Sequence, residues 1–290
     1  MIRAALAAVL LAAPAWAQDR PVIVADSYPM AYFAERLAGN AAEVRLSVPD
    51  GRDPSSWRPG LADVVAIQAA DLIVLNGSGL SDWTTRAALP RARTVDTGRG
   101  LADDRIATET ITHSHGEEGS HSHEGVATHT WLDFALAARQ AEALAAAMAR
   151  ALPDAPVDAS LGALLSDLAT LDAAGDALTG GRTVPVIVSH PRYEYFGRAY
   201  GLAVEALDWE AGAAPDADAL ADLASRADRT SARILIWEAE PPTEARDAVA
   251  ALGLSQVVLP PMATPPAEGD FVTGLRDGMA ALGAAIAAGG

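Results

Sequence analysis

Between Asp158 and Gly181 the chain reads DASLGALLSDLATLDAAGDALTGG. Its leucines recur at helical spacing, at Leu161, Leu164, Leu165, Leu168 and Leu171, and the pair Gly180-Gly181 ends the pattern. A second Ala/Leu-rich stretch, WLDFALAARQAEALAAAMARAL, precedes it across a break at Pro153–Pro156. This long helical stretch separates two sets of strand-like runs, and that arrangement decides the fold.

Short apolar runs alternate with helical patterns on both sides of this stretch. In the first half the runs are PVIVADSYP (Pro21–Pro29), EVRLSVPD (Glu43–Asp50) and DLIVLNGS (Asp71–Ser78), with helices centred near Phe33–Leu37 and Leu61–Ala69. In the second half they are VPVIVSH (Val184–His190), LAVEALDW, ARILIWEAEPP and SQVVLPP. Continuous apolar runs are typical of strands buried on both faces, as in a parallel sheet. We therefore predict an α/β fold of two lobes with mostly parallel sheets, joined by one long linker helix. Ligands are expected at the carboxyl ends of the strands, in the crevice between the lobes.

The N-terminus has the composition of a secretory signal peptide. Met1-Ile2-Arg3 gives a positive start, Ala4 to Ala13 is apolar, and Ala15-Trp16-Ala17 is a small-x-small cleavage site. The apolar run is shorter than the roughly 20 residues that a membrane-spanning helix needs. No cysteine follows the cleavage site, so no lipid-attached form is expected.

The signal peptide and the two sets of strands around the long helical stretch predict a periplasmic protein in four parts. They are a signal peptide (1–17), a first, metal-binding lobe (18–150), a linker helix (151–181) and a second lobe (182–290).

Five of the six histidines lie between His113 and His129, in THSHGEEGSHSHEGVATHTW. Neutral imidazole is a common metal ligand, and short His-rich tracts suit zinc, copper or nickel. In an extended backbone, residues two apart share one side, so four histidines of this loop (residues 111–127) are candidate weak ligands: His113, His115, His121 and His123. The glycines and glutamates predict that Ile111–Gly125 is irregular and exposed.

Charge and motif content exclude several classes of function. The formal net charge is −17 and no basic run is present, which excludes nucleic acid and anionic membrane surfaces as partners. The chain lacks cysteine, a Gly-rich phosphate loop, His-Glu-x-x-His and Gly-x-Ser-x-Gly. We predict a monomer without enzymatic activity. A mononuclear metal hydrolase is the remaining enzymatic alternative, because an incompletely ligated metal leaves a position open for water.

Three motifs occur in the order known from one family of binding proteins. They are His129-Thr130-Trp131-Leu132-Asp133, then VIVSHPRYEYFGRAYGL with His190 after an apolar strand, then Trp237–Pro241 with Glu240 before a proline. Over essentially the whole mature chain, the sequence resembles the periplasmic solute-binding receptors of zinc/manganese ABC importers, of the zinc-uptake type with a His-rich loop. The resemblance implies that His129 and His190 are metal ligands in the cleft.

Two of the four ligands that the resemblance implies are replaced. Ser55 stands where the family has a histidine after a Gly-x-Asp-Pro turn, and Val258–Ala263 lacks the usual carboxylate. A closed zinc site normally has four protein ligands. The sequence leaves open whether the shell is completed by water, by a loop histidine or by a carboxylate from this group: Asp53, Glu238, Glu240, Glu268 and Asp270. Of these, Glu240 and Asp270 are included in the predicted site.

The resemblance implies a periplasmic receptor that binds Zn²⁺, with Mn²⁺ or Cu²⁺ as alternatives. It would capture the ion between the lobes with a modest hinge movement and deliver it to an ABC permease in the inner membrane. The loop histidines would raise the local metal concentration near the cleft. The alternative is a periplasmic zinc/copper chaperone or buffer that acts through the loop alone. A periplasmic metallochaperone is a second candidate partner.

Overall fold

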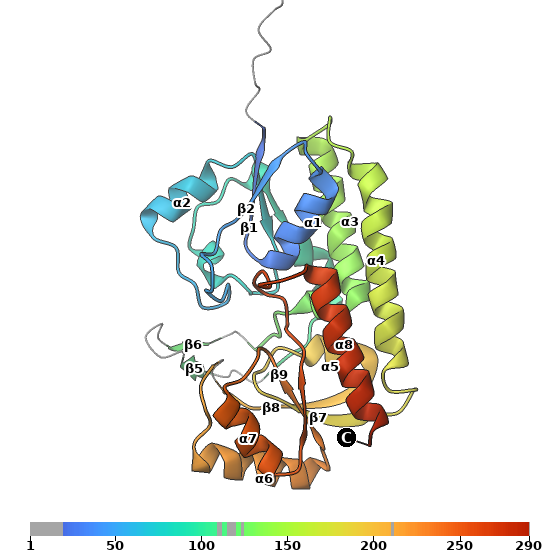
Figure 1. The fold of residues 1–290 in the computed structure, drawn as a ribbon. Coiled ribbons are helices and arrows are strands. Elements are labelled where there is room, and N and C mark those ends of the chain that lie inside the picture. The colour runs from blue at the N-terminus through green and yellow to red at the C-terminus, as the bar shows by residue number, and fades with distance from the viewer. Residues whose placement is uncertain (1–19, 109–111, 115–119, 123–124, 210–211, 290) are drawn as a thin grey trace, which may run out of the picture.

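The computed structural model describes residues 20–108, 112–114, 120–122, 125–209 and 212–289 (Figure 1). The predicted signal peptide lies outside the described residues, as do His115 and His123. Within the described part of the chain, no helix is long and apolar enough to cross a membrane.

Two four-stranded parallel sheets form the centres of two lobes, which confirms the predicted fold class. The first sheet has the order β2-β1-β3-β4, and its strands are β1 (Val22–Ala25), β2 (Glu43–Leu46), β3 (Leu72–Leu75) and β4 (Thr94–Asp96). The second sheet has the order β10-β9-β7-β8, and its strands are β7 (Val184–Val188), β8 (Leu202–Ala206), β9 (Ile234–Trp237) and β10 (Ser255–Val258). The first strand of each lobe lies between two neighbours: β1 pairs with β2 and β3, and β7 pairs with β8 and β9. The direction in which successive strands are added therefore reverses at β1 and at β7. Such a reversal opens a crevice at the carboxyl ends of the strands.

Helices cover the sheets. In the first lobe and the connection they are α1 (Tyr28–Ala38), α2 (Leu61–Gln68), α3 (Phe134–Ala151) and α4 (Val157–Ala177). In the second lobe they are α5 (Glu194–Tyr200), α6 (Ala217–Thr230), α7 (Thr243–Ala251) and α8 (Phe271–Ala287). Short 3₁₀ turns complete the first lobe at η1 (Asp82–Thr85), η2 (Arg91–Arg93), η3 (Thr97–Asp104) and η5 (Thr130–Leu132).

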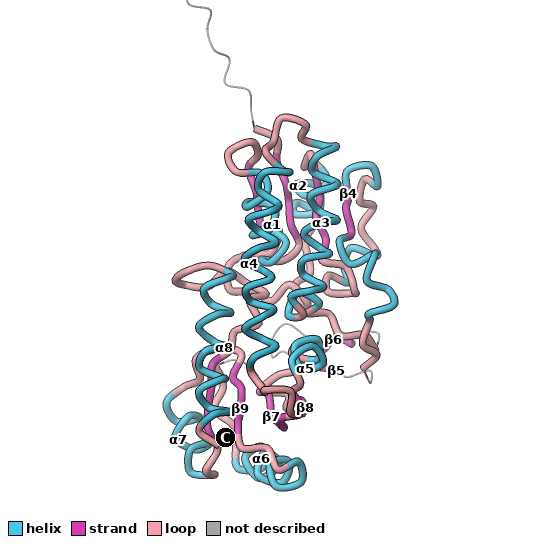
Figure 2. Tube along the Cα trace, turned by 90° about the vertical axis from the view of Figure 1, so that its right-hand side faces the viewer, coloured by secondary structure: helices cyan, strands magenta, loops and turns pink. Residues whose placement is uncertain are grey.

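Two long helices, rather than one, connect the lobes. Helix α4 packs on α1 and α3 of the first lobe and on α5 and α8 of the second. Figure 2 shows α4 running lengthwise beside both lobes, next to α3. The leucines at helical spacing explain this position, because Leu164, Leu168 and Leu171 are buried in one apolar cluster that extends into both lobes. The connection is therefore packed along its length and is not a free hinge.

One sequence prediction about the His-rich loop is wrong. Ile111–Gly125 is not irregular throughout, since β5 (Thr112–Ser114) and β6 (Ser120–Ser122) pair as antiparallel strands. The register places His113 opposite His121. Pairing satisfies backbone N–H and C=O groups that an open loop would leave to water, and the composition of the loop gives no sign of this pairing. The prediction that the side chains of this loop are exposed to solvent concerns residues outside the described part of the chain.

Candidate metal centre between the lobes

His129 lies at the boundary between the lobes, where the chain re-enters the first lobe before η5. It is buried, with 3% of its surface exposed. Its ring packs against Trp131, with 4.7 Å between the ring centroids. Its Nδ1 lies 3.0 Å from the Thr128 hydroxyl, and its Nε2 lies 3.2 Å from Nη1 of Arg192. Trp131 in turn donates its indole N–H to the Pro261 carbonyl of the second lobe, at 2.7 Å. His129 is thus held by packing at the place where the resemblance implied a ligand.

The neighbouring contact identifies the tautomer of His129. A guanidinium has five N–H donors and no acceptor, so the Nε2 that faces Arg192 must carry a lone pair. The proton of the neutral ring is then on Nδ1, which donates to the Thr128 hydroxyl. His129 therefore presents the lone pair of Nε2 toward a cation.

That cation is the side chain of Arg192, which the sequence interpretation missed. Arg192 follows β7 in the second lobe and is 6% exposed. Its Nε donates to Oε2 of Glu238 at 2.6 Å, and its Nη2 donates to Oδ2 of Asp53 in the first lobe. One guanidinium thus joins a carboxylate of each lobe and the imidazole of His129. Burying a charge in this way requires such partners.

Asp53 is held in its charged form. Burial by itself would raise the pKa of its carboxyl, but the Arg192 guanidinium and the Ser55 hydrogen bonds hold that pKa well below its usual range. The backbone N–H and the hydroxyl of Ser55 both donate to Oδ1 of Asp53, at 2.7 and 2.6 Å. Ser55 therefore orients Asp53.

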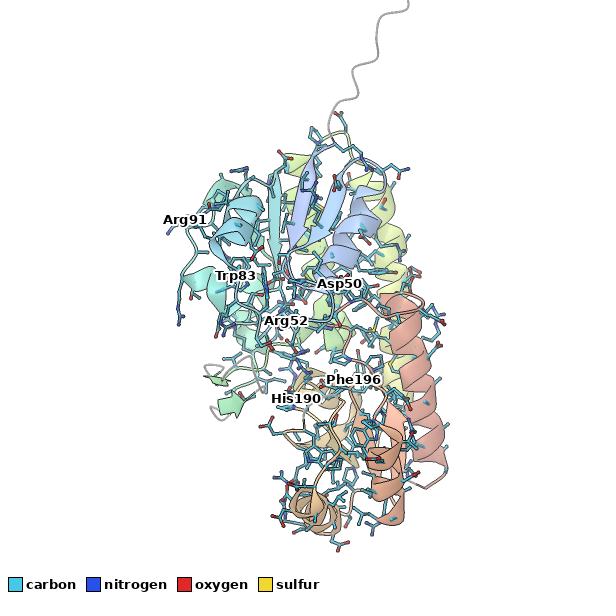
Figure 3. All side chains as sticks on the ribbon, turned by 60° about the vertical axis from the view of Figure 1, so that its left-hand side comes forward. Asp50, Arg52, Trp83, Arg91, His190 and Phe196 are labelled. Carbon is cyan, nitrogen blue, oxygen red and sulfur yellow. The ribbon has the colours of Figure 1, made fainter. Side chains whose placement is uncertain are left out.

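His190 is also buried, at 4% exposure, directly beyond the carboxyl end of β7. Figure 3 shows it at the end of the second lobe that faces the loop with Asp50 and Arg52. Its Nδ1 lies 3.3 Å from the Trp209 carbonyl and 3.6 Å from Oδ1 of Asp208. An imidazole that donates Nδ1–H to a carbonyl or carboxylate offers Nε2 to a metal, as ligating histidines usually do.

The other predicted ligands have different surroundings. Glu240 is exposed and pairs with Arg246. Asp270 is the N-cap of α8, where Oδ1 accepts from the Thr273 N–H at 2.8 Å and Oδ2 from the Tyr32 hydroxyl at 3.3 Å. Glu268 is exposed.

Among the described residues, no group of three or more histidines and carboxylates is close enough to hold a metal ion. Of the loop histidines, only the backbone register of His113 and His121 is described.

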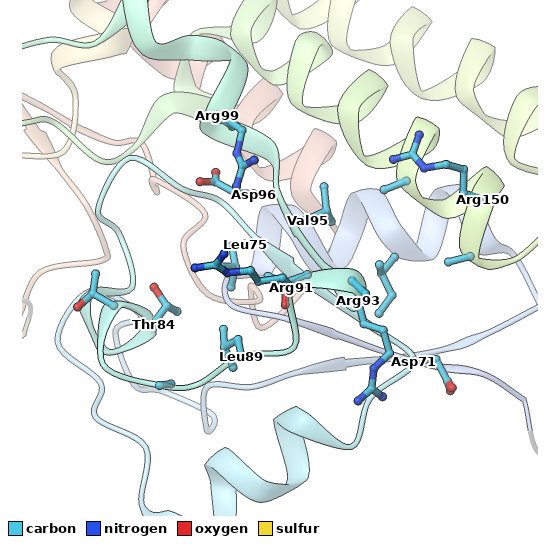
Figure 4. A pocket seen from close by; sticks show the side chains of 17 residues that line it. Asp71, Leu75, Thr84, Leu89, Arg91, Arg93, Val95, Asp96, Arg99 and Arg150 are labelled. Atoms are coloured by element: carbon cyan, nitrogen blue, oxygen red, sulfur yellow. The ribbon is translucent and has the colours of Figure 1, made fainter.

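A large hollow lies elsewhere and offers different chemistry. It has a volume of about 1160 Å³ and lies beside β4, where Arg91, Arg93, Arg99 and Arg150 are among the lining residues (Figure 4). No histidine lines this hollow. The buried imidazoles of His129 and His190 lie at the lobe boundary and not in this hollow.

Comparisons with known proteins agree with this architecture. The family model described as zinc-uptake complex component A, periplasmic, matches residues 23–285. The zinc-binding lipoprotein AdcA of Streptococcus pneumoniae R6 is 28% identical over 204 residues, which are 68% of this chain and 40% of AdcA. The high-affinity zinc uptake system protein ZnuA of Bacillus subtilis 168 is 25% identical over 237 residues, 76% of this chain and 71% of that protein. The match therefore spans less than half the length of AdcA.

The fold is also that of a solved relative. The crystal structure of Zn(II)-bound AdcA from Streptococcus pneumoniae superposes with a TM-score of 0.76 at 20% sequence identity, covering 92% of this chain and 57% of that one. At this identity the likeness shows the fold alone. The family match, which runs from β1 into α8, shows more. The chain belongs to the zinc-uptake complex component A family of periplasmic metal-binding solute-binding proteins, a family of binding proteins and not of enzymes.

Proposed function

We propose that this protein is a periplasmic zinc receptor that captures the ion between its lobes and delivers it to an ABC permease. One observation carries the proposal: a buried imidazole nitrogen and two buried or half-buried carboxylates, from both lobes, converge on a single cationic group. All three are ligand types that bind zinc. Family membership supports zinc or manganese as the metal, and imidazole favours zinc over manganese.

In this proposal the ligands are His129, Asp53 and Glu238, with His190, two residues before Arg192 in the chain, as the fourth. His129 and His190 each have Nδ1 beside an oxygen atom, so Nε2 is the coordinating nitrogen of both. Asp53 and His129 come from the first lobe, whereas Glu238 and His190 come from the second. An ion held by all of them would join the lobes. Glu240 and Asp270 are left out of this set because Arg246 and the α8 cap engage them.

Calorimetry of the metal-stripped chain with ZnCl₂ tests the proposal. We expect one tight ion per chain, and a fall in affinity of roughly 10- to 100-fold or more when a ligand is lost, as in His129→Ala, His190→Ala or Glu238→Gln. The matched control is Glu240→Gln, which removes an exposed carboxylate two residues away from Glu238 and should leave the affinity unchanged. Unchanged tight binding in both histidine variants would overturn the cleft as the receptor site.

One observation favours a second function, that of a zinc or copper buffer acting through the His-rich loop. The cleft already holds an arginine, whereas the strand register places His113 and His121 opposite each other. Deletion of residues 113–123 separates the two functions. If the parent binds several zinc ions weakly and the deletion abolishes this binding, the protein is a buffer. If the shortened chain still binds one zinc ion tightly, the protein is a receptor.

A further inference from the structure

The cation at the lobe boundary is part of the protein itself. Three acceptors surround the Arg192 guanidinium: Oε2 of Glu238, Oδ2 of Asp53 and Nε2 of His129. We infer that Arg192 is a resident cation in the place of a metal ion, and that zinc enters this site only after the guanidinium has left it. The inference rests on the proposed function, because it concerns the same cleft.

The charges of this cluster favour exchange for a divalent ion. Two carboxylates and one guanidinium have a formal sum of −1, so the resident cation leaves one negative charge uncompensated. A Zn²⁺ ion in the same place would bring the sum to zero. Electrostatic attraction is strong where water is excluded, and Arg192, Glu238 and His129 are largely withdrawn from solvent.

Guanidinium and zinc cannot occupy the cluster together. The three acceptors contact three different nitrogens of one guanidinium, so this planar group fills the space between them. Zinc needs its ligand atoms at about 2.0–2.2 Å from one point, and no three histidines and carboxylates of the described chain are close enough to hold a metal ion. Metal binding therefore requires Arg192 to leave and its three partners to close inward.

A competing internal cation lowers the apparent affinity for zinc. The apparent affinity of a site is its intrinsic affinity multiplied by the fraction of molecules in which the site is free to bind. The ion pairs of Arg192 lower that fraction, because they stabilise the form in which the guanidinium occupies the site. The same group would assist release, because it can return to the carboxylates as the ion departs. Arg192 lies in the connection between β7 and α5, outside regular structure, which permits such a movement.

Titration of the full chain with ZnCl₂ tests this inference. In Arg192→Met the apolar stem is retained without the charge, and we expect zinc to bind at least about tenfold more tightly than in the parent chain. Arg52→Met is the matched control, because it changes the net charge equally at an exposed residue of the Asp53 loop; its affinity should stay within about twofold of the parent. Arg192→Lys retains a cation without the planar fork and should give an intermediate affinity.

A measurement on the parent chain covers the case in which Arg192→Met does not fold. In protein labelled with ¹⁵N-arginine, the Nε–H signal of Arg192 should shift or broaden as zinc occupies the cleft. An unchanged signal in the zinc-saturated chain would overturn the inference.

The outcomes separate this inference from the proposed function. Equal, tight zinc binding by the parent and Arg192→Met would refute the resident cation and leave the receptor intact. Cleft binding by Arg192→Met alone would support the resident cation and refute a zinc receptor in the parent. No cleft binding by either chain would refute both.

Discussion

At the scale of single residues, Arg192 shows why the site was harder to predict than the fold. Its partners Asp53 and Glu238 lie 139 and 46 residues away in the chain. The sequence offers both carboxylates as candidate ligands, and the motif around His129 predicts its place at the cleft. Nothing in local spacing reveals that these groups meet at an arginine. The one sequence signal for this meeting is the position of Arg192, two residues after His190 at the carboxyl end of a buried strand. A charged side chain at such a place needs partners of opposite charge.

Asp26 gives a prediction about stability. It follows β1 and is 2% exposed, and burial raises the pKa of its carboxyl from 3.8 to about 6, although the Asn76 N–H donates to Oδ1 at 2.9 Å. Between these two values the folded protein holds a proton that the unfolded chain releases. Asp26 therefore makes the free energy of unfolding fall as pH rises from about 4 to about 6, by at most about 3 kcal/mol.

We expect Asp26→Asn to remove this decline and to raise the melting temperature at pH 7.5. The amide keeps an oxygen for the Asn76 N–H and has no charge to bury. Chemical denaturation of both chains at several pH values measures the difference, in which the contributions of other carboxylates cancel. Asp50→Asn, at an exposed position, is the control and should follow the parent. If Asp26→Asn and the parent show the same pH dependence, the carboxyl is not protonated in the folded state.

At the scale of elements, the strands and long helices could be predicted because their patterns are local. Each predicted run became a strand of a parallel sheet, of which β1, β3, β7 and β9 are mostly buried, and the leucine spacing identified α4. The small hairpin β5–β6 could not be predicted, since five of its six residues are Ser or His, which are not among the strand-favouring types, and their pairing depends on backbone bonds. The second connecting helix, α3, was recognised as a helical pattern, but its role beside α4 depends on packing between elements.

Helix α4 contains two glycines that should respond oppositely to alanine. A Cβ at Gly175 would lie 2.6 Å from the ring of Tyr200, whose hydroxyl bonds Asp172 and the Phe134 N–H. Because that ring is fixed by these bonds, we expect Gly175→Ala to lower the free energy of unfolding by about 1–3 kcal/mol.

Gly162, in the same helix, meets nothing within 4 Å and is exposed. Gly162→Ala should therefore raise the free energy of unfolding by about 0.5–1 kcal/mol, through helix propensity alone. Urea denaturation of the two variants checks both signs. A Gly175→Ala chain as stable as Gly162→Ala would mean that the contact between α4 and Tyr200 is loose.

At the scale of the whole molecule, the two lobes are continuous in their packing. One apolar cluster contains Ile23 of the first sheet, Leu168 of α4 and Ile234 of the second sheet. Hydrogen bonds cross the boundary as well, from the Trp131 indole to the Pro261 carbonyl and from the Phe134 N–H to the Tyr200 hydroxyl. The Asp53–Arg192 pair adds a charged link between the lobes. Unfolding one lobe would thus expose apolar surface of the other.

We therefore expect the chain to unfold in one cooperative transition in spite of its two sheets. Differential scanning calorimetry of the metal-stripped protein should give a ratio of calorimetric to van't Hoff enthalpy of about 1. Trp131→Phe removes the bond to the Pro261 carbonyl and keeps an aromatic ring in the core, so it should lower the melting temperature without splitting the transition. Two resolved transitions in the parent chain, or a ratio near 2, would show that the lobes unfold independently and that the shared cluster does not couple them. A split in Trp131→Phe alone would place most of that coupling in this single hydrogen bond, because the apolar cluster is otherwise retained.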